Sequence, residues 1–173
     1  MADAMTPIGA IGSAVDRLVG GVMFHSEHAD LCWYMGLDEL ARENEDGYRH
    51  DSKCLRKLHR LAIEHIGITL PEGTQSRSGL LDQYANESRW KVGLNTRKRA
   101  LERILTDMVE WEEGTCAVLR ESHKVLLEDG DATLAKEVRR IIMDTEDELA
   151  GYRSELARFQ SVNWDLELAM WPR

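Results

Sequence analysis

The sequence has few prolines and no long apolar run, and these absences set the first limits on its class. Only 3 prolines occur in 173 residues, and Pro7 and Pro172 lie near the two ends, so long uninterrupted helices are allowed. No stretch of about 18 consecutive apolar residues is present, so we expect no membrane span. The first residues lack a basic cluster and include two aspartates, which disfavours a signal peptide. These features predict a cytoplasmic protein.

Cysteine and positive charge are also scarce. The three cysteines, Cys32, Cys54 and Cys116, are scattered and form no CxxC pair, which fits buried thiols in a reducing compartment. Acidic residues outnumber basic ones by 31 to 22, for a net charge of −9. Nucleic-acid binding requires clustered Lys and Arg, so DNA binding or protection is disfavoured.

Helical spacing of apolar residues runs through most of the chain, which contains 43% hydrophobic residues. The periodicity predicts four helices, over about residues 8–42, 48–66, 96–128 and 132–160. Turn signals at 43–47 and 129–131 predict two helical hairpins. The long connection between the hairpins is sufficient to cross a bundle lengthwise and leave the second and third helices parallel. We predict one all-α domain over residues 1–173, a four-helix bundle with one long crossover and a short helix in the C-terminal tail.

A helical-wheel construction places one polar residue of each helix on its core-facing side: His25, His59, Glu112 and Glu148. Measured from the two predicted turns, all four lie near the middle of the bundle. Buried carboxylates need a partner, and imidazole with carboxylate suits iron, manganese or zinc. The sequence therefore offers these four residues as metal ligands, with iron first. The alternative is a hydrogen-bonded structural network. Further candidates for the site are His28, Asp51 and His123, and no catalytic residue is assigned.

A second stripe on the first predicted helix lies away from the predicted core and consists of Phe24, His28, Leu31 and Met35. An extra apolar face on an amphipathic helix is typical of a subunit interface. Packing against the crossover or the tail is the alternative. We expect a homo-oligomer, a dimer or a larger assembly.

Two segments, LHRLAIEHIGITLPEG (58–73) and LEDGDATLAKEVRRIIMDTEDELAGYRSEL (127–156), are similar to the corresponding parts of ferritin-like proteins. Over about residues 10–160 the arrangement resembles the ferritin-like superfamily, including bacterial ferritins and Dps-type mini-ferritins. The resemblance implies iron binding, with oxidation of ferrous iron and iron storage as the activities. Glu112 matches the glutamate of the third helix in ferritins, and His28 resembles the interface histidine of Dps-type proteins.

The chain departs from this family at the metal ligands. Di-iron members carry a Glu-x-x-His motif on each of two helices, and neither the second nor the fourth predicted helix contains one. The resemblance therefore implies an atypical or incomplete iron centre. The alternative function is that of a non-catalytic helical protein for oligomerisation or partner binding, which has lost the di-iron site.

Overall fold

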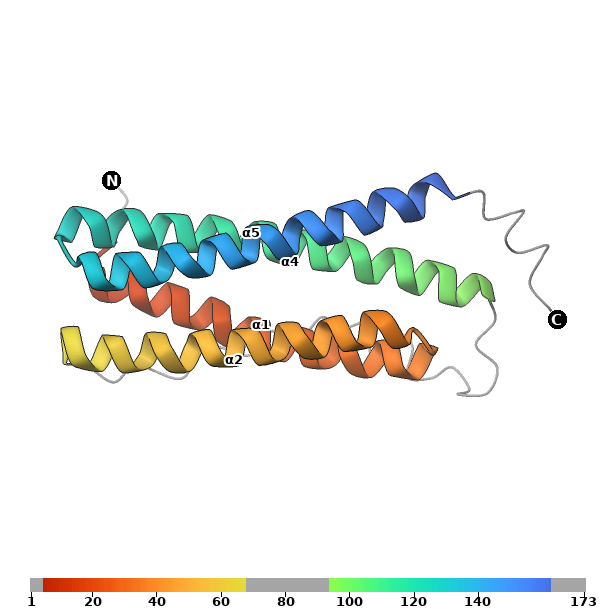
Figure 1. Cartoon of the computed structure of the whole chain (residues 1–173), viewed down its shortest axis with the longest axis horizontal. Coiled ribbons are helices and arrows are strands. Elements are labelled where there is room, and N and C mark those ends of the chain that lie inside the picture. Colours follow the sequence, from red (N-terminus) through yellow and green to blue (C-terminus); the bar gives the residue numbers. More distant parts are fainter. Residues whose placement is uncertain (1–4, 68–93, 163–173) are drawn as a thin grey trace.

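The computed structural model describes residues 5–67 and 94–162, and these residues form four helices (Figure 1). The helices are α1 (Pro7–Met35), α2 (Asp38–Ile66), α4 (Leu94–Asp129) and α5 (Ala132–Ser161). The described residues contain no strand, so the prediction of an all-α four-helix bundle is confirmed. The predicted crossover and tail helix lie outside the described residues.

The turn between α1 and α2 is formed by Gly36 and Leu37. Gly36 has φ 71°, and its N–H bonds to carbonyl oxygens of the last turn of α1, a common way for glycine to end a helix. The helix α2 then starts with Asp38 and Glu39. Acidic side chains in the first turn of a helix interact favourably with the helix dipole. The predicted boundary at residue 42 and turn at 43–47 were therefore wrong, because α2 continues through the Asp46-Gly47 pair.

The turn between α4 and α5 lies where the sequence predicted it. Gly130 has φ 88°, a conformation that favours glycine over other residues. The Asp131 carboxylate then caps α5 by accepting a hydrogen bond from the Leu134 N–H at 3.0 Å. This fixes the relative register of α4 and α5.

The helices pack so that α2 and α4 run in the same direction, antiparallel to α1 and α5 (Figure 1). The first half of α4 packs with the start of α2, and the second half of α4 packs with the end of α2. The end of α2 and the start of α4 therefore lie at opposite ends of the bundle. The contacts between α2 and α5 are far fewer than those between α1 and α2 or between α4 and α5.

The core consists of two apolar clusters, one in each half of the bundle. One cluster includes Leu18, Leu58 and Leu119, and the other includes Leu31, Ile104 and Met108. On α2, α4 and α5 the two clusters are separated by a stretch that carries buried or half-buried polar residues, and on α1 the buried His25 lies next to Phe24, where the second cluster begins. This polar layer lies across the middle of the bundle.

The helix α1 has the length and composition of a possible membrane span, with a mean hydropathy of 1.2 in its most apolar window. A core helix of a soluble protein and a signal sequence have the same properties. In the bundle, Ile11, Val15 and Leu18 are buried against the other helices. The apolar character of α1 thus matches its position in the core.

Candidate metal centre

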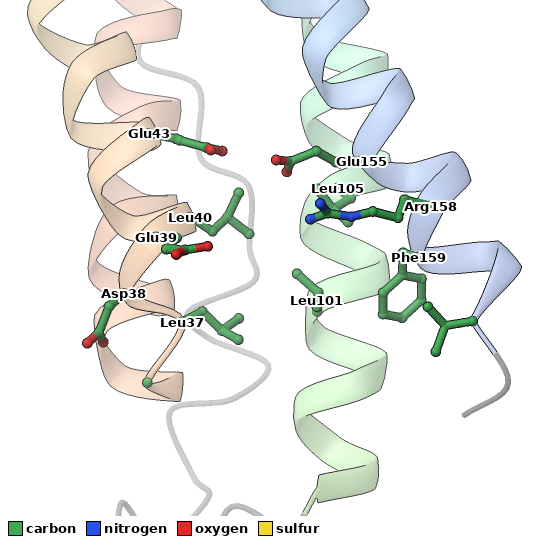
Figure 2. Close-up of a pocket in the computed structure, with 12 residues that line it drawn as sticks. Leu37, Asp38, Glu39, Leu40, Glu43, Leu101, Leu105, Glu155, Arg158 and Phe159 are labelled. Carbon is green, nitrogen blue, oxygen red and sulfur yellow. The ribbon is translucent and has the colours of Figure 1, made fainter. Parts of the chain in front are cut away.

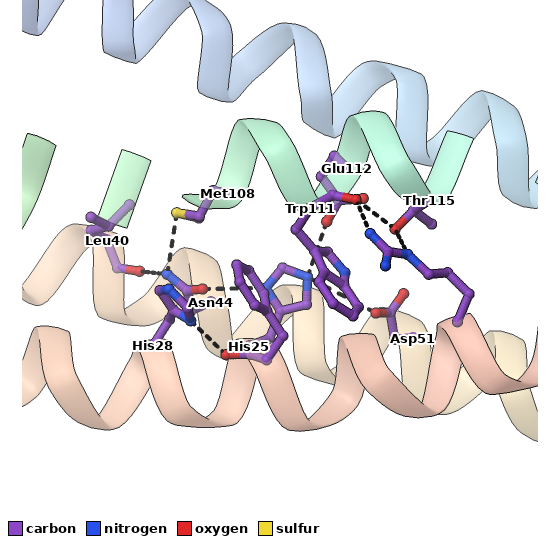
Figure 3. Close-up of polar contacts among 11 residues, drawn as sticks. His25, His28, Leu40, Asn44, Asp51, Met108, Trp111, Glu112 and Thr115 are labelled. Carbon is purple, nitrogen blue, oxygen red and sulfur yellow. Dashed lines mark hydrogen bonds and ion pairs between the residues drawn. The ribbon is translucent and has the colours of Figure 1, made fainter. Parts of the chain in front are cut away.

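One acidic or imidazole side chain from each helix enters the polar layer. His25 comes from α1, Asp51 from α2 and Glu112 from α4 (Figure 3). Glu148 comes from α5. His25 Nε2 lies 3.3 Å from Glu112 Oε1 and 3.9 Å from Asp51 Oδ2. Ligand atoms of His25, Glu112 and Glu148 all lie within 4.8 Å of one another. Such spacing allows the three side chains to bind one ion.

Asn44 of α2 orients the imidazole of His25. Its Nδ2 donates to the Leu40 carbonyl oxygen at 2.9 Å, which leaves Oδ1 facing His25 Nδ1 at 3.2 Å (Figure 3). We therefore assign the Nδ1 proton of His25 to a bond with Asn44. In the neutral ring, Nε2 then carries a lone pair that points toward the carboxylates. A polar group that fixes the tautomer in this way is typical of metal-binding histidines.

Two glycines make room for the buried polar side chains. A Cβ on Gly47 of α2 would lie 2.9–3.0 Å from three atoms of the His25 ring. A Cβ on Gly21 of α1 would overlap the Asp51 carboxylate. Helix α2 thus has a glycine where His25 of α1 reaches it, and α1 has a glycine where Asp51 of α2 reaches it. Neither glycine has a positive φ, so close approach explains both.

An arginine closes the layer on the side between α1 and α4. The Arg17 guanidinium lies 3.5 Å from the centroid of the Trp111 ring, and its Nε donates to Thr115 Oγ1 at 2.8 Å. The Trp111 ring stacks in turn on Phe24, with centroids 4.9 Å apart. Gly114 leaves the space that the guanidinium fills, since a Cβ there would lie 2.8 Å from it. The result is a rigid wall with a positive charge beside the acids.

The buried charges shift one another's ionisation. Burial opposes protonation of His25, but its contact with Glu112 and the charge of Asp51 outweigh burial and raise the pKa of His25 to about 9. Burial and the neighbouring carboxylates raise the pKa of Asp51 to about 7, and they raise the pKa of Glu148 to about 7 as well. Additional positive charge, from protons or from a bound cation, would therefore stabilise these carboxylates even with His25 and Arg17 nearby.

The sequence correctly brought together His25, Glu112 and Glu148, but His59 does not join them. His59 is 12 residues beyond Gly47 on α2, or about 18 Å along the helix from the level of the His25 ring. Its ring is half-buried, and Nε2 has no hydrogen-bond partner among the described residues. Asp51, predicted only as a further candidate, occupies the position expected for His59.

The other two further candidates also lie outside the layer. His28 is fully buried, and its Nδ1 bonds to the Phe24 carbonyl oxygen at 2.8 Å. Burial lowers the pKa of His28 to about 4, and its Nε2 lies 4.0 Å from Asp107 Oδ2. His123 follows Glu112 by 11 residues on α4, about 16 Å along the helix.

The predicted interface stripe is not on the surface of the bundle. Its four members are 0–5% exposed and lie within the chain's own core: Phe24, His28, Leu31 and Met35. The prediction of an interface at these residues was therefore wrong. The error arose from the misplaced first turn. Because α2 starts at Asp38, this face of α1 packs against α4 and α2.

No family model matches the chain, and no curated protein matches it significantly.

Sequence reasoning missed Asn44, Gly47 and Arg17. Asn44 and Gly47 belong to the segment that was read as a turn, so no core role was considered for either. Arg17 lies one helical turn before Gly21 on α1, on the side that faces α4. Glycines inside a helical apolar pattern were the available signal, since they often mark a close approach.

Proposed function

We propose that this chain binds one divalent metal ion at the centre of its helical bundle, with iron as the first candidate and manganese or zinc as alternatives. His25, Glu112 and Glu148 are the proposed ligands, and Asp51 is the fourth donor. The observation that carries the proposal is the convergence of these side chains around an imidazole nitrogen. His25 Nε2 is buried and points at carboxylates, with Glu112 Oε1 at 3.3 Å and Asp51 Oδ2 at 3.9 Å.

The donor set fits such an ion. One imidazole and three carboxylates suit iron, manganese and zinc, and Asn44 holds the imidazole in the tautomer that binds metal. The charge of Arg17 acts on both Asp51 and Glu112 and opposes a second divalent ion beside them. We therefore expect one ion per chain rather than a di-iron pair.

The ferritin-like resemblance extends this proposal to ferrous iron oxidation. A bound ferrous ion supplies one electron to an acceptor such as dioxygen, and the chain's carboxylates stabilise the more highly charged ferric product. Storage of iron and assembly into a homo-oligomer belong to the same proposal. We also propose a cytoplasmic location, which the burial of α1 supports, and the lack of nucleic-acid partners, which the net charge of −9 supports.

Metal content tests the proposal directly. Untagged protein is purified without chelators, analysed by mass spectrometry, and titrated anaerobically with ferrous iron. We expect about one ion per chain for the wild type, loss of that ion in Glu112→Gln, and retention in His59→Gln. Circular dichroism of each variant verifies folding. No metal above background in the wild type, or unchanged stoichiometry in Glu112→Gln, would instead make the layer a structural network.

A partner-binding scaffold is the alternative function, and the structure offers no specific support for it. The stripe on which it rested is buried, and the tail tryptophans Trp164 and Trp171 lie outside the described residues.

A further inference from the structure

A cavity of about 450 Å³ lies between α2 and α5, which contact each other far less than α1 contacts α2 or α4 contacts α5. Its lining includes Glu148, one of the proposed ligands. Gly47 also lines it, and the missing side chain of Gly47 is what admits the His25 ring. The cavity therefore leads from the surface to Glu148 and to the backbone of Gly47, against which the His25 ring packs.

Across this cavity, α5 contributes a second glycine. A Cβ on Gly151 would have no neighbouring atom within 4 Å. Gly151 thus leaves the space between the two helices open beside Glu148. A larger side chain at Gly151 would extend into open space, without overlap of the surrounding chain.

The charge of this opening is negative. Glu43 of α2 and Glu155 of α5 line both this cavity and a neighbouring one nearer the α1–α2 turn. Figure 2 shows the two carboxylates pointing toward each other from opposite walls. Arg158 lines the neighbouring cavity with these two acids, but lysine and arginine are missing from the described residues that line the cavity beside Glu148. Acids that line a concave surface raise the local concentration of cations.

The opposite side of the site carries arginines as well as acids. There, between α1 and α4, the guanidinium of Arg17 lies against Trp111, and the same surface depression is lined by Arg103, Asp107 and Glu110. Arg103 pairs with Asp107 at 2.9 Å. A cation that approached from that side would meet the Arg17 guanidinium and a stacked aromatic wall, whereas the described lining of the cavity beside Glu148 holds acids without lysine or arginine.

We propose that divalent cations enter the site through the cleft between α2 and α5, where Glu43 and Glu155 attract them and Glu148 receives them. This inference rests on the proposed metal site. It assigns Glu43 and Glu155 a role in the rate of binding, whereas His25, Glu112 and Glu148 set the affinity. Blocking the cleft is then expected to slow binding without weakening it.

The test compares binding rates with binding affinities, and cobalt(II) is the probe because its visible absorption changes on coordination. Gly151→Leu narrows the cleft. Gly12→Leu is the matched control, since Gly12 is a helical glycine whose Cβ also meets no atom within 4 Å and lies about 20 Å along α1 from His25. In stopped-flow measurements we expect Gly151→Leu to lower the association rate by about 10-fold or more. Gly12→Leu is expected to bind at the wild-type rate, and the equilibrium affinity of both variants is expected to stay unchanged.

A second pair of variants tests the charges and does not depend on the folding of Gly151→Leu. The double variant Glu43→Gln/Glu155→Gln removes the facing carboxylates. Glu121→Gln/Asp147→Asn makes the same change in net charge at exposed positions on α4 and α5. We expect the first pair alone to slow association several-fold at low salt, with the difference lost near 0.5 M salt because of screening.

The outcomes separate the two proposals. Wild-type rates in Gly151→Leu, or equal rates in the two charge variants, would overturn the access route while leaving the metal site intact. Failure of the wild type to bind cobalt would overturn the site and the route together.

Discussion

Replacing Gly47 with alanine is expected to disturb the proposed site through a single added methyl group. The new Cβ would lie 2.9 Å from the His25 ring, whereas ordinary contacts begin at 3.4 Å. The ring must therefore move by about 0.5 Å, the difference between these distances. Binding sites generally tolerate displacements of no more than about 0.5 Å, and the bond to Asn44 resists the movement.

We expect Gly47→Ala to weaken metal binding by about 10- to 100-fold, the range found when the support of a ligand is lost. That range corresponds to about 1.4–2.7 kcal/mol. The affinity is measured by cobalt titration in competition with a chelator, and stability by thermal unfolding with and without metal. In the absence of metal, the gain of about 0.5–1 kcal/mol from replacing a helical glycine is expected to be reduced or lost through the contact with the ring.

Gly151→Ala is the control for this prediction. The substitution is chemically identical and lies on the facing helix, but its Cβ enters open space. We expect it to raise stability by about 0.5–1 kcal/mol and to leave metal affinity unchanged. Equal metal affinities for the two alanine variants would refute the inference that the absence of a side chain at Gly47 positions His25.

Further predictions concern metal affinity, the pH dependence of stability and the location of the chain in the cell. Asn44→Ala removes the hydrogen-bond acceptor of His25 and should weaken cobalt binding by about 10- to 100-fold in the same competition titration. Arg17→Met removes a competing positive charge and should tighten binding several-fold, and unchanged or weaker binding would contradict this electrostatic argument. Glu137 is largely buried, and although burial opposes its ionisation, hydrogen bonds from Arg140 and Lys57 lower its pKa. Because the folded-state pKa is the lower one, the stabilisation is present above the unfolded pKa of about 4.3 and is lost as pH falls through the folded value. Wild type should therefore exceed Glu137→Gln in urea stability at pH 7, with a gap that narrows at pH 3.5. Cell fractionation should recover the chain in the soluble fraction, and recovery in the membrane pellet would assign α1 to a membrane.

The sequence was sufficient to place Glu112 beside Glu148 because the turn between their helices was located correctly. Gly130, with acidic residues on both sides, is a strong stop signal, and both glutamates can be counted back from it. Helix periodicity then gave the direction in which each side chain points. Register and direction together determine which residues meet.

The start of α2 was predicted wrongly because Asp46-Gly47 has the composition of a turn but lies within a helix. The composition cannot reveal that Gly47 is needed for contact with His25 rather than for a positive φ. Gly36 was the actual turn residue, and the displacement of the turn by about ten residues moved every expected partner of α1. His59 was consequently chosen where Asp51 and Asn44 lie. The contact between two helices depends on their relative register, and an error at one turn changes that register along the full length of both.

The polar layer between the two apolar clusters also restricts how the four helices can be arranged. If one helix slid by a single turn, the His25 ring would lose both Asn44 and the space at Gly47, and Glu112 would be pushed toward an apolar cluster. Apolar contacts alone discriminate weakly between such neighbouring arrangements, because one leucine can replace another. A buried charged group permits only the arrangement in which its partners meet. The same side chains that are proposed to bind metal therefore give this bundle a unique alignment.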